Sequence, residues 1–406
     1  MNIEEELHII TRNAVEVLPG KDEMRNVLEL ARKEDRPLKV KYGVDPTAPD
    51  IHLGHTVVLW KLRDFQNLGH IVQFIIGDFT ARIGDPSGRN EARKPLSEDE
   101  IRKNARTYLG QVFKILDKEK TLVVPNSKWF GKMKLNDFLE IASHYTVARV
   151  LERAEFRERF KNKQEISLLE FIYPLLQGYD SVMLENDIEI GGTDQTFNLL
   201  VGRDLQRDYG KKQQVVITMP LLEGTDGVRK MSKTYNNYIG ITEPPDEMYG
   251  KVMSIPDSLI FRYMKLLTSV PEEKILEIEE KVKQDKMNPR DAKAFLAFEL
   301  VVMYHNRKEA ERAAYEFNRV FAGKELPSEM PVLEIDKDKI WIVELLVMSG
   351  YAKNKTEANR LILQGGVEVD RKTVKTPDMD LILNTEHILK VGKHRFLKIK
   401  GVRDKQ

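Results

Sequence analysis

Three segments near the amino terminus carry hydrophobic patterns that predict a strand, a helix and a second strand. Residues 38–44 alternate weakly between apolar and polar side chains, as in a strand with one buried face. Residues 55–68 carry a helical pattern that ends at Gly69, and residues 71–76 form an apolar run typical of a buried strand. The order strand, helix, strand predicts a βαβ unit.

The middle of the chain continues this alternation. Residues 135–160 and 168–184 are predicted to be helical, and the strand candidates that follow are residues 187–190 and 214–219. Since helices separate the strands, an open parallel sheet is the most economical arrangement, and such sheets bind ligands beyond the carboxyl ends of their strands. We therefore expect one cleft to collect the segments that follow strands. These segments are residues 45–55, 77–93, 191–195 and 230–234.

The carboxyl-terminal part of the chain changes pattern twice. After residue 245 the pattern becomes helical without strand candidates, over residues 257–267, 272–284, 289–305 and 308–321. Residues 322–335 contain two prolines and a glycine and show no periodicity, as a linker would. In the final module the pattern predicts, in order, helices at residues 341–348 and 356–364 and a strand at residues 367–370.

We predict an α/β fold with more than one domain, because 406 residues are many for a single core. The expected parts are a Rossmann-like parallel-sheet domain with a helical insertion at residues 1–235, an α-helical domain at residues 236–325, a linker at residues 326–338, and a small α+β module at residues 339–406.

Composition sets limits on location and chemistry. Hydrophobic residues make up 41% of the chain and charged residues 32%, and no apolar run approaches the roughly 20 residues of a membrane span. The first six residues include three glutamates and carry a net negative charge, unlike the basic start of a secretory signal. We therefore expect a cytoplasmic protein without a membrane partner. With no cysteine, disulfides and thiolate zinc sites are excluded.

Charge is unevenly distributed, although the whole chain carries a formal charge of only +1. Residues 341–406 contain 13 Lys and Arg against 8 Asp and Glu, a net charge of +5, whereas the preceding residues contain 52 against 56, a net charge of −4. A basic terminal module indicates contact with nucleic acid. Its candidate RNA-binding side chains are Lys353, Lys355, Arg360, Arg371 and Lys372.

The stretch His52-Leu53-Gly54-His55 stands where the first predicted helix should begin. Helix starts attract anions, imidazoles can donate hydrogen bonds to phosphate, and Gly54 lets a nucleotide approach the backbone. Taken alone, these histidines could equally be surface residues or, with Asp45, part of a metal site. The other histidines stand in unrelated contexts, so we predict no metal site.

The stretch Lys230-Met231-Ser232-Lys233-Thr234 would add fixed positive charge to such a phosphate site. Two lysines in a loop are usually solvated surface, which is the ordinary alternative. This loop follows a predicted strand end, where a mobile flap over a cleft is expected. The two stretches together therefore favour a site for a nucleotide triphosphate.

Two further clusters are candidates for a polar pocket. Residues 191–195, Gly-Gly-Thr-Asp-Gln, form either an ordinary turn or a pocket wall at a strand end. Tyr173, Gln177 and Asp180 share one otherwise apolar helix face, which is satisfied either by protein groups and solvent or by a polar ligand. Pro174 disfavours helical geometry at the preceding residue and makes Tyr173 a candidate helix start.

Residues 83–89, Ile-Gly-Asp-Pro-Ser-Gly-Arg, are followed by a second arginine at position 93. The segment could be a plain type I turn with a basic flank. In combination with the other clusters, Arg89 and Arg93 become candidates for phosphate contacts.

Together these motifs resemble those of bacterial tyrosyl-tRNA synthetases, a family of class I aminoacyl-tRNA synthetases. HLGH and KMSKT resemble the two class I signatures, and GVDPTAPDIHLGH, IGDPSG, YPLLQGYD and GGTDQ resemble the tyrosine branch in order and approximate spacing. The resemblance covers nearly the whole chain. The final module resembles a small RNA-binding fold named after a ribosomal protein of the small subunit.

The resemblance implies activation of L-tyrosine by ATP and transfer of tyrosine to tRNA(Tyr) by a homodimer. Magnesium would accompany ATP as substrate, with no tightly bound cofactor, and the helical domain would bind the anticodon side of tRNA. The implied catalytic residues are His52, His55 and Thr47 on the ATP phosphates, with Lys230 and Lys233 on the departing pyrophosphate. The implied ATP site also includes Gly54, Gly192, Arg89, Arg93 and, on the ribose, Asp194.

The implied tyrosine site divides into the two polar ends of the substrate. Asp85, Tyr173 and Gln177 would hold the ammonium group, Asp180 would accept a hydrogen bond from the phenol, and Gln195 would orient the amino acid, with Asp45 and Lys41 completing the site.

One position departs from the family pattern. Tyr-Cys-Gly is common where this chain has Lys41-Tyr42-Gly43, so the tyrosine expected to share the phenol with Asp180 is replaced by Lys41. Lys41 either points inward, to balance Asp180 and donate to the phenol, or points outward to solvent. Arg89 stands where a lysine often stands, which keeps a cation but changes its geometry.

Three other functions fit the sequence less well than this resemblance. A tryptophanyl-tRNA synthetase is disfavoured by GGTDQ and by the face carrying Gln177 and Asp180. A small-molecule nucleotidyltransferase leaves the basic module and KMSKT unexplained. A catalytically silent RNA-binding paralogue is disfavoured by the intact histidines and lysines.

Overall fold

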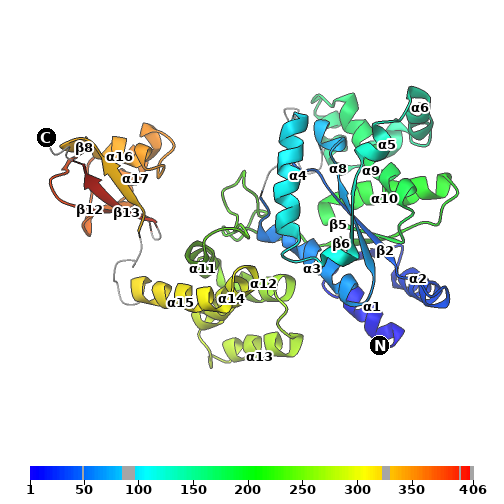
Figure 1. Ribbon diagram of the computed structural model, residues 1–406, viewed down its shortest axis with the longest axis horizontal. Coiled ribbons are helices and arrows are strands. Elements are labelled where there is room, and N and C mark those ends of the chain that lie inside the picture. Colours follow the sequence, from blue (N-terminus) through cyan, green and yellow to red (C-terminus); the bar gives the residue numbers. More distant parts are fainter. Residues whose placement is uncertain (48–49, 85–96, 322–329, 393–394, 403–406) are drawn as a thin grey trace. The chain divides into compact units, whose positions relative to one another are not determined.

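The protein is described from a computed structural model (Figure 1). The chain divides into two compact units, residues 1–310 and 311–406, each of which is described by itself. The described residues are 1–47, 50–84, 97–321, 330–392 and 395–402.

A six-stranded sheet forms the centre of the first unit, in the order β1-β6-β5-β2-β3-β4. All neighbouring strands are parallel except β1, which pairs antiparallel with β6. The apolar runs of β3 and β6 are almost wholly buried, as expected for strands covered on both faces. The strands are β1 (Glu16–Leu18), β2 (Lys39–Val44), β3 (Ile71–Ile76), β4 (Thr121–Pro125), β5 (Ile188–Gly192) and β6 (Val215–Met219).

The strand order creates a topological switch between β2 and β5. From β2 the chain proceeds outward to β3 and β4, whereas from β5 it proceeds to β6 in the opposite direction. Because parallel crossovers are right-handed, α3 (Leu53–Asn67) and α10 (Thr196–Asp208) cover opposite faces of the sheet. Figure 1 shows α3 and α4 on one side and α9 and α10 on the other. The carboxyl ends of β2 and β5 therefore diverge into a crevice.

The helices of this unit follow the predictions in part. The helix expected at residues 168–184 is α9 (Leu168–Leu184), which starts at the capping residue Ser167 and continues through Pro174. Tyr173 therefore lies inside a helix rather than at its start. The helix expected at residues 135–160 is three shorter helices, because extended residues such as Thr146 and Arg153 break it. The helices are α1 (Ile3–Thr11), α2 (Lys21–Lys33), α4 (Glu98–Val112), α5 (Ser127–Phe130), α6 (Leu135–Ser143), α7 (Val147–Val150) and α8 (Ala154–Lys161).

The predicted helical region beyond residue 245 is confirmed. Its helices are α11 (Pro245–Met253), α12 (Ile260–Leu267), α13 (Glu272–Lys283), α14 (Pro289–Tyr304) and α15 (Arg307–Phe321). The indole of Trp60 on α3 donates a hydrogen bond to the Tyr304 hydroxyl at 3.2 Å. The helices α11 to α14 belong to the same compact unit as the sheet, so the boundary expected at residue 235 does not separate compact units.

The second unit contains a five-stranded sheet in the order β10-β9-β12-β13-β7 and a ribbon of β8 with β11. Its core includes Leu345, Leu346 and Ile362 from the two helices. Its elements are β7 (Val332–Ile335), β8 (Lys339–Trp341), α16 (Ile342–Met348), α17 (Lys355–Leu363), β9 (Val367–Val369), β10 (Lys372–Thr373), β11 (Asp380–Ile382), β12 (His387–Val391) and β13 (Arg395–Gly401).

The prediction that residues 326–338 form a linker is wrong for residues 332–335. Residues 332–335 form β7, which pairs in parallel with β13 and buries Ile335 in the core of the unit. Two prolines and a glycine nearby obscured this short alternation in the sequence. Among the described residues, no helix is long and apolar enough to cross a membrane.

Candidate active site

A cavity of about 950 Å3 lies beyond the carboxyl ends of the parallel strands, at the switch between β2 and β5. Its walls come from the ends of β2, β3 and β5, the starts of α3 and α10, helix α9 and the loop 221–235. Segments far apart in the sequence thus converge on one cleft, as predicted. The predicted site residues that line it are Asp45, Thr47, His52, Gly54, His55, Tyr173, Gln177, Asp180, Gly192, Asp194, Gln195, Lys230 and Lys233.

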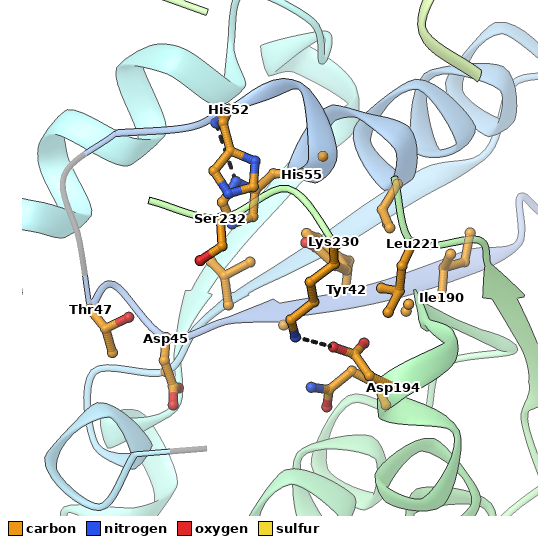
Figure 2. Close-up of a pocket in the computed structure, with 18 of the residues that line it drawn as sticks. Tyr42, Asp45, Thr47, His52, His55, Ile190, Asp194, Leu221, Lys230 and Ser232 are labelled. Atoms are coloured by element: carbon orange, nitrogen blue, oxygen red, sulfur yellow. Dashed lines mark hydrogen bonds and ion pairs between the residues drawn. The ribbon is translucent and has the colours of Figure 1, made fainter. Parts of the chain in front are cut away.

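The two histidines stand at the start of α3, with their ring centroids 3.8 Å apart (Figure 2). The backbone N–H of His52 donates to Nδ1 of His55 at 3.3 Å, so a neutral His55 carries its proton on Nε2. Burial, and then nearby positive groups including Lys233, lowers the pKa of His55 to about 4. Burial also lowers the pKa of His52 to about 2. Both rings are therefore uncharged hydrogen-bonding groups at neutral pH.

Gly54 is required for this arrangement of the rings. A Cβ at this position would lie 3.0 Å from Nδ1 and 3.1 Å from Cε1 of His52, closer than side chains normally approach. Nδ1 of His52 is buried and has no hydrogen-bond partner among the described residues. Those residues also contain no group of three histidine, aspartate or glutamate side chains placed to bind a metal ion.

The two lysines of the 230–234 loop are each paired with a carboxylate of the same cleft. Nζ of Lys230 lies 3.3 Å from Asp194, as Figure 2 shows, and Nζ of Lys233 lies 3.1 Å from Asp50. All four side chains are partly exposed, so these pairs contribute little to stability and can exchange for other partners. The loop therefore brings two cations to the cleft in pairs that are easily broken.

The buried side chain of Asn237 braces the lysine loop. Its Oδ1 accepts from the backbone N–H of Ser232 at 2.8 Å, and its Nδ2 donates to the carbonyl of Lys230 at 3.2 Å and to Asp226 at 2.9 Å. One amide thus holds the backbone on both sides of Met231. Asn237 was not predicted, because it stands three residues beyond the motif and shows no pattern of its own.

At the α9 side of the cleft, Asp45 connects the end of β2 to two neighbours. Its carboxylate accepts from the hydroxyl of Tyr173 at 2.9 Å and from the hydroxyl of Thr80 at 2.7 Å. Gly77 makes room for it, since a Cβ there would lie 2.1 Å from Oδ1 of Asp45. Asp45 and Tyr173, predicted in one site from distant motifs, are therefore in direct contact.

Asp180 lines the cavity and is only 3% exposed. Its carboxylate accepts from the indole N–H of Trp129 at 3.0 Å and from the amide of Asn126 at 3.4 Å. Burial raises the pKa of Asp180 to about 7, although Lys41 and these two donors oppose the rise. Near neutral pH this group is poised between its charged and neutral forms.

The outward orientation predicted for Lys41 is wrong, whereas the inward orientation holds in part, because the charge of Lys41 favours the ionised form of Asp180. Lys41 is nevertheless not among the side chains that line the cavity. Its side chain is fully buried, which excludes solvent. Its ammonium group lies 2.9 Å from Glu189 and donates to the carbonyl of Gln177 and the hydroxyl of Ser181. The physical reason is the acidic residue at the facing position of β5, which captures the lysine before it reaches the cavity.

Three predicted residues, Asp85, Arg89 and Arg93, lie outside the described residues. Prediction also missed Asp50, Thr80 and Glu189, which line the cavity, and Asn126 and Trp129, which donate hydrogen bonds to Asp180. Asn126 and Trp129 directly follow β4, so the rule that ligands gather at strand ends would have found them had β4 been predicted.

In the second unit, the five basic residues predicted to bind RNA are all exposed. Lys353, Lys355 and Arg360 lie on or just before α17, whereas Arg371 and Lys372 lie at the turn from β9 into β10. Arg371 has a positive φ of 66°, which turns the chain tightly between these two strands. The predicted cations thus belong to two neighbouring stretches of this unit.

Comparison with known proteins agrees with this geometry. The family model described as tRNA synthetases class I (W and Y) matches residues 33–322, and that of the S4 domain matches residues 340–381. The tyrosine–tRNA ligase of Carboxydothermus hydrogenoformans is 53% identical, over 98% of this chain and 98% of its own. The chain belongs to the tyrosine–tRNA ligases of class I.

Other tyrosine–tRNA ligases support this assignment. That of Thermotoga maritima is 51% identical, over 99% of this chain and 98% of its own. The tyrosyl-tRNA synthetase of Archaeoglobus fulgidus, solved in complex with L-tyrosine, has a TM-score of 0.63 at 25% identity and covers 77% of this chain and 100% of that chain. The predicted family and fold are confirmed, and the tryptophan-branch and nucleotidyltransferase interpretations are wrong.

Proposed function

We propose that the cavity holds L-tyrosine along α9 and ATP with magnesium between the start of α3 and the lysine loop. The tyrosine carboxylate attacks the α-phosphorus, a carboxyl oxygen–phosphorus bond forms, and the bond to the β-phosphate oxygen breaks to release pyrophosphate. A hydroxyl of the 3′-terminal ribose of tRNA(Tyr) then attacks the tyrosyl carbonyl carbon, an ester bond forms, and the bond to the adenylate phosphate oxygen breaks to release AMP. The observation that carries this proposal is the convergence of paired histidines, paired lysines and a polar helix face on one cleft.

At the phosphate end, neutral histidines and mobile lysines have different tasks. His52 and His55 donate hydrogen bonds to the phosphates, and Thr47 contacts the phosphates beside them. Both histidines lie at the amino-terminal end of α3, the end of a helix that favours anions. Lys230 and Lys233 leave Asp194 and Asp50 and meet the charge that develops on pyrophosphate. Arg89 and Arg93 are proposed as further phosphate contacts.

Release of Lys230 also frees Asp194 for the ribose hydroxyls. Gly192 supports this assignment, because a Cβ there would lie 2.7 Å from Oδ1 of Asp194 and would displace that carboxylate. The exchange of partners therefore couples nucleotide binding to movement of the loop. Catalysis in this scheme is alignment and electrostatic stabilisation, without a protein nucleophile.

At the tyrosine end, Tyr173 and Gln177 hold the ammonium group together with Asp85, and Asp45 fixes the hydroxyl of Tyr173. Asp180 accepts the phenolic hydrogen bond, and Gln195 orients the amino acid. A phenol donates a hydrogen bond to this buried carboxylate, whereas phenylalanine leaves the carboxylate without that donor. The free-energy cost of the missing hydrogen bond gives the site its selectivity for tyrosine.

The second unit and the helices α11 to α15 are proposed to bind tRNA, the helices on the anticodon side. The exposed cations of α17 and the β9–β10 turn support this role, because phosphate contacts dominate RNA affinity. Deleting residues 331–406 is expected to spare adenylate formation and to abolish most tRNA charging. An intact enzyme and a truncated one with equal salt dependence of tRNA binding would refute an electrostatic role.

We also propose a cytoplasmic homodimer. Residues 135–169 expose a series of large apolar side chains, which support the proposal of an interface in this region. These side chains are Leu135, Leu139, Val147, Phe160, Leu168 and Leu169. Light scattering of the wild type and of Leu168→Asp tests this interface, with a smaller mass expected for the variant.

Amino-acid-dependent exchange of pyrophosphate into ATP tests the central reaction. Exchange is expected with tyrosine and not with tryptophan or the other amino acids, and it should fall when Lys233 is replaced by alanine. A protein that binds tRNA but shows no tyrosine-dependent exchange would be a catalytically silent paralogue, and the proposal would be wrong.

A further inference from the structure

A buried ion pair joins β2 to β5 beside the cavity, whose wall includes Glu189 but not Lys41. Nζ of Lys41 on β2 and Oε1 of Glu189 on β5 are 2.9 Å apart, and their side chains are 0% and 2% exposed. Removing two charges from water costs several kcal/mol each, so such a pair stabilises a fold weakly at best. Its presence at the active site therefore calls for an explanation other than stability.

The ammonium group of Lys41 is engaged by three protein groups. It donates hydrogen bonds to the carbonyl of Gln177 at 2.9 Å and the hydroxyl of Ser181 at 2.8 Å, and its charge is paired with Glu189 at 2.9 Å. Lys41 therefore does not replace the family's usual tyrosine as a direct donor to the phenol. Any hydrogen-bonding effect of Lys41 on tyrosine binding must therefore act through α9.

Two of these acceptors belong to the turn of α9 that carries the tyrosine ligands. Gln177 and Ser181 stand on either side of Asp180, and the side chains of Gln177 and Asp180 both line the cavity. The hydroxyl of Ser181 in turn donates to Oε2 of Glu189 at 3.0 Å. The ion pair thus ties this turn of α9 to both β2 and β5.

The other contacts of Glu189 complete a closed network. Its Oε2 also accepts from the amide of Gln214, and α10 leaves room for this contact at Gly202. A Cβ on Gly202 would lie 2.8 Å from the Gln214 amide, 2.8 Å from the Ser181 hydroxyl and 3.0 Å from Glu189. Gly202 is outside the cavity wall, so the network can be disturbed there without touching a substrate contact.

We propose that Lys41 and Glu189 are positioning residues for tyrosine, which hold the turn from Gln177 to Ser181 so that Asp180 meets the phenolic hydroxyl. In this chain a buried ion pair at the pocket wall contributes to selectivity by fixing the turn that carries Asp180. The inference rests on the proposed assignment of Asp180, and it adds Glu189 and Gly202 to the residues that determine specificity.

The charge of Lys41 supports the same role. The charged groups acting on Asp180 are Lys41 from β2, which favours its ionised form, and Glu189 from β5, which opposes it, while Trp129 and Asn126 donate hydrogen bonds from the segment after β4. Loss of the lysine removes the cation that keeps the carboxylate available as an acceptor. Tyrosine affinity should then require a higher pH.

The test compares Lys41→Met/Glu189→Gln, which removes both charges together, with Gly202→Ala, which disturbs the network and keeps both. In each variant the KM for tyrosine in pyrophosphate exchange should rise about tenfold and the preference for tyrosine over phenylalanine should fall by a similar factor. The KM for ATP should stay within about twofold, and the pH at which tyrosine affinity rises should increase in the double variant.

The matched control is Lys61→Met/Asp64→Asn, which removes a lysine–carboxylate pair on α3 and outside the cavity wall, with side chains 3% and 20% exposed. A control with the same loss of selectivity would indicate a general effect of destabilisation and overturn the inference. Unchanged selectivity in both network variants would also overturn it. If Asp180→Asn in the wild-type background leaves selectivity intact, the proposed assignment of Asp180 to the phenol is wrong, which is a different failure from that of the network.

Discussion

The two ends of the cavity are built in opposite ways. At the α9 end, Asp180 is buried, and its supporting residues Lys41 and Glu189 have their hydrogen bonds satisfied by the protein. At the loop end, Lys230 and Lys233 are partly exposed and hold carboxylates that they can release. One end is preorganised before substrate arrives, whereas the other must exchange partners when ATP binds.

This difference indicates a division of labour. A preorganised, desolvated acceptor discriminates between amino acids that differ by one hydroxyl, because an unmet hydrogen bond is costly only where water cannot replace it. Cations on a loop are poorly suited to such discrimination, but they can follow the negative charge that moves onto a leaving group. Selectivity should therefore reside in α9 and its support, and rate should reside in the loop.

The largest expected effect is on the rate of activation. Lys233→Ala should slow adenylate formation by about 100- to 1,000-fold while tyrosine affinity stays near that of the wild type, because the cation acts mainly in the transition state. Single-turnover kinetics measures the rate, and equilibrium dialysis measures the affinity. Lys211→Ala, which removes a surface lysine paired with Glu185 outside the cavity, should change neither quantity.

A smaller effect is expected at the opposite end. Asp180→Asn should reduce the preference for tyrosine over phenylalanine by about 10- to 100-fold, since a neutral amide accepts the phenolic hydrogen bond less well. The ratio of kcat/KM for the two amino acids in pyrophosphate exchange measures this change. Undiminished selectivity would remove Asp180 from the tyrosine site.

The effect of His55 on the free energy of unfolding at low pH gives a further test of the comparison. The pKa of His55 is lowered to about 4, so below pH 6.5 the unfolded chain binds protons that the folded chain resists, and the free energy of unfolding falls as pH falls. Asp180, whose pKa is raised to about 7, acts with the opposite sign over the same range. His55→Gln should therefore lose less stability than the wild type between pH 7 and pH 5, by roughly 1–2 kcal/mol in urea unfolding.

An identical pH dependence of unfolding in the wild type and in His55→Gln would show that His55 is not held neutral by burial. The matched replacement His8→Gln, at an exposed histidine on α1, should leave the pH dependence of unfolding unchanged.

The smallest effect concerns tyrosine affinity in the wild type. Because the pKa of Asp180 is raised to about 7 and a phenolic donor favours the ionised carboxylate, affinity for tyrosine should increase by up to about tenfold between pH 6 and pH 8. Affinity for phenylalanine should change less over this range. Asp180→Asn should abolish the difference, and a persistent difference would assign the titration to another group.

Much of the sheet and the cleft was predictable because strand ends and motifs follow local rules. The run at residues 71–76 and the helix at residues 168–184 appear with the predicted bounds. The short edge strands β1 and β4 were not predicted, since three to five residues carry too little pattern to distinguish a strand from a loop. Without β4, the residues after it could not be assigned to the cleft.

The pairing of Lys41 with Glu189 could not be read from local pattern, because it depends on which strand lies next to β2. Those residues are 148 positions apart, and only the sheet order brings β5 beside β2. Lys41 by itself allowed two orientations, and the structure shows the inward one with a partner, Glu189, that the motifs did not indicate. Long-range pairs of this kind are decided by topology rather than by motif.

The division of labour is tested most directly by the tyrosine dependence of the single-turnover activation rate in Lys233→Ala and Asp180→Asn. In Lys233→Ala, the predicted result is a low maximal rate with a near-normal half-saturating tyrosine concentration. In Asp180→Asn, the predicted result is a raised half-saturating tyrosine concentration with a maximal rate close to that of the wild type. The reverse pattern, with tyrosine affinity lost in Lys233→Ala and only the maximal rate lost in Asp180→Asn, would contradict the account.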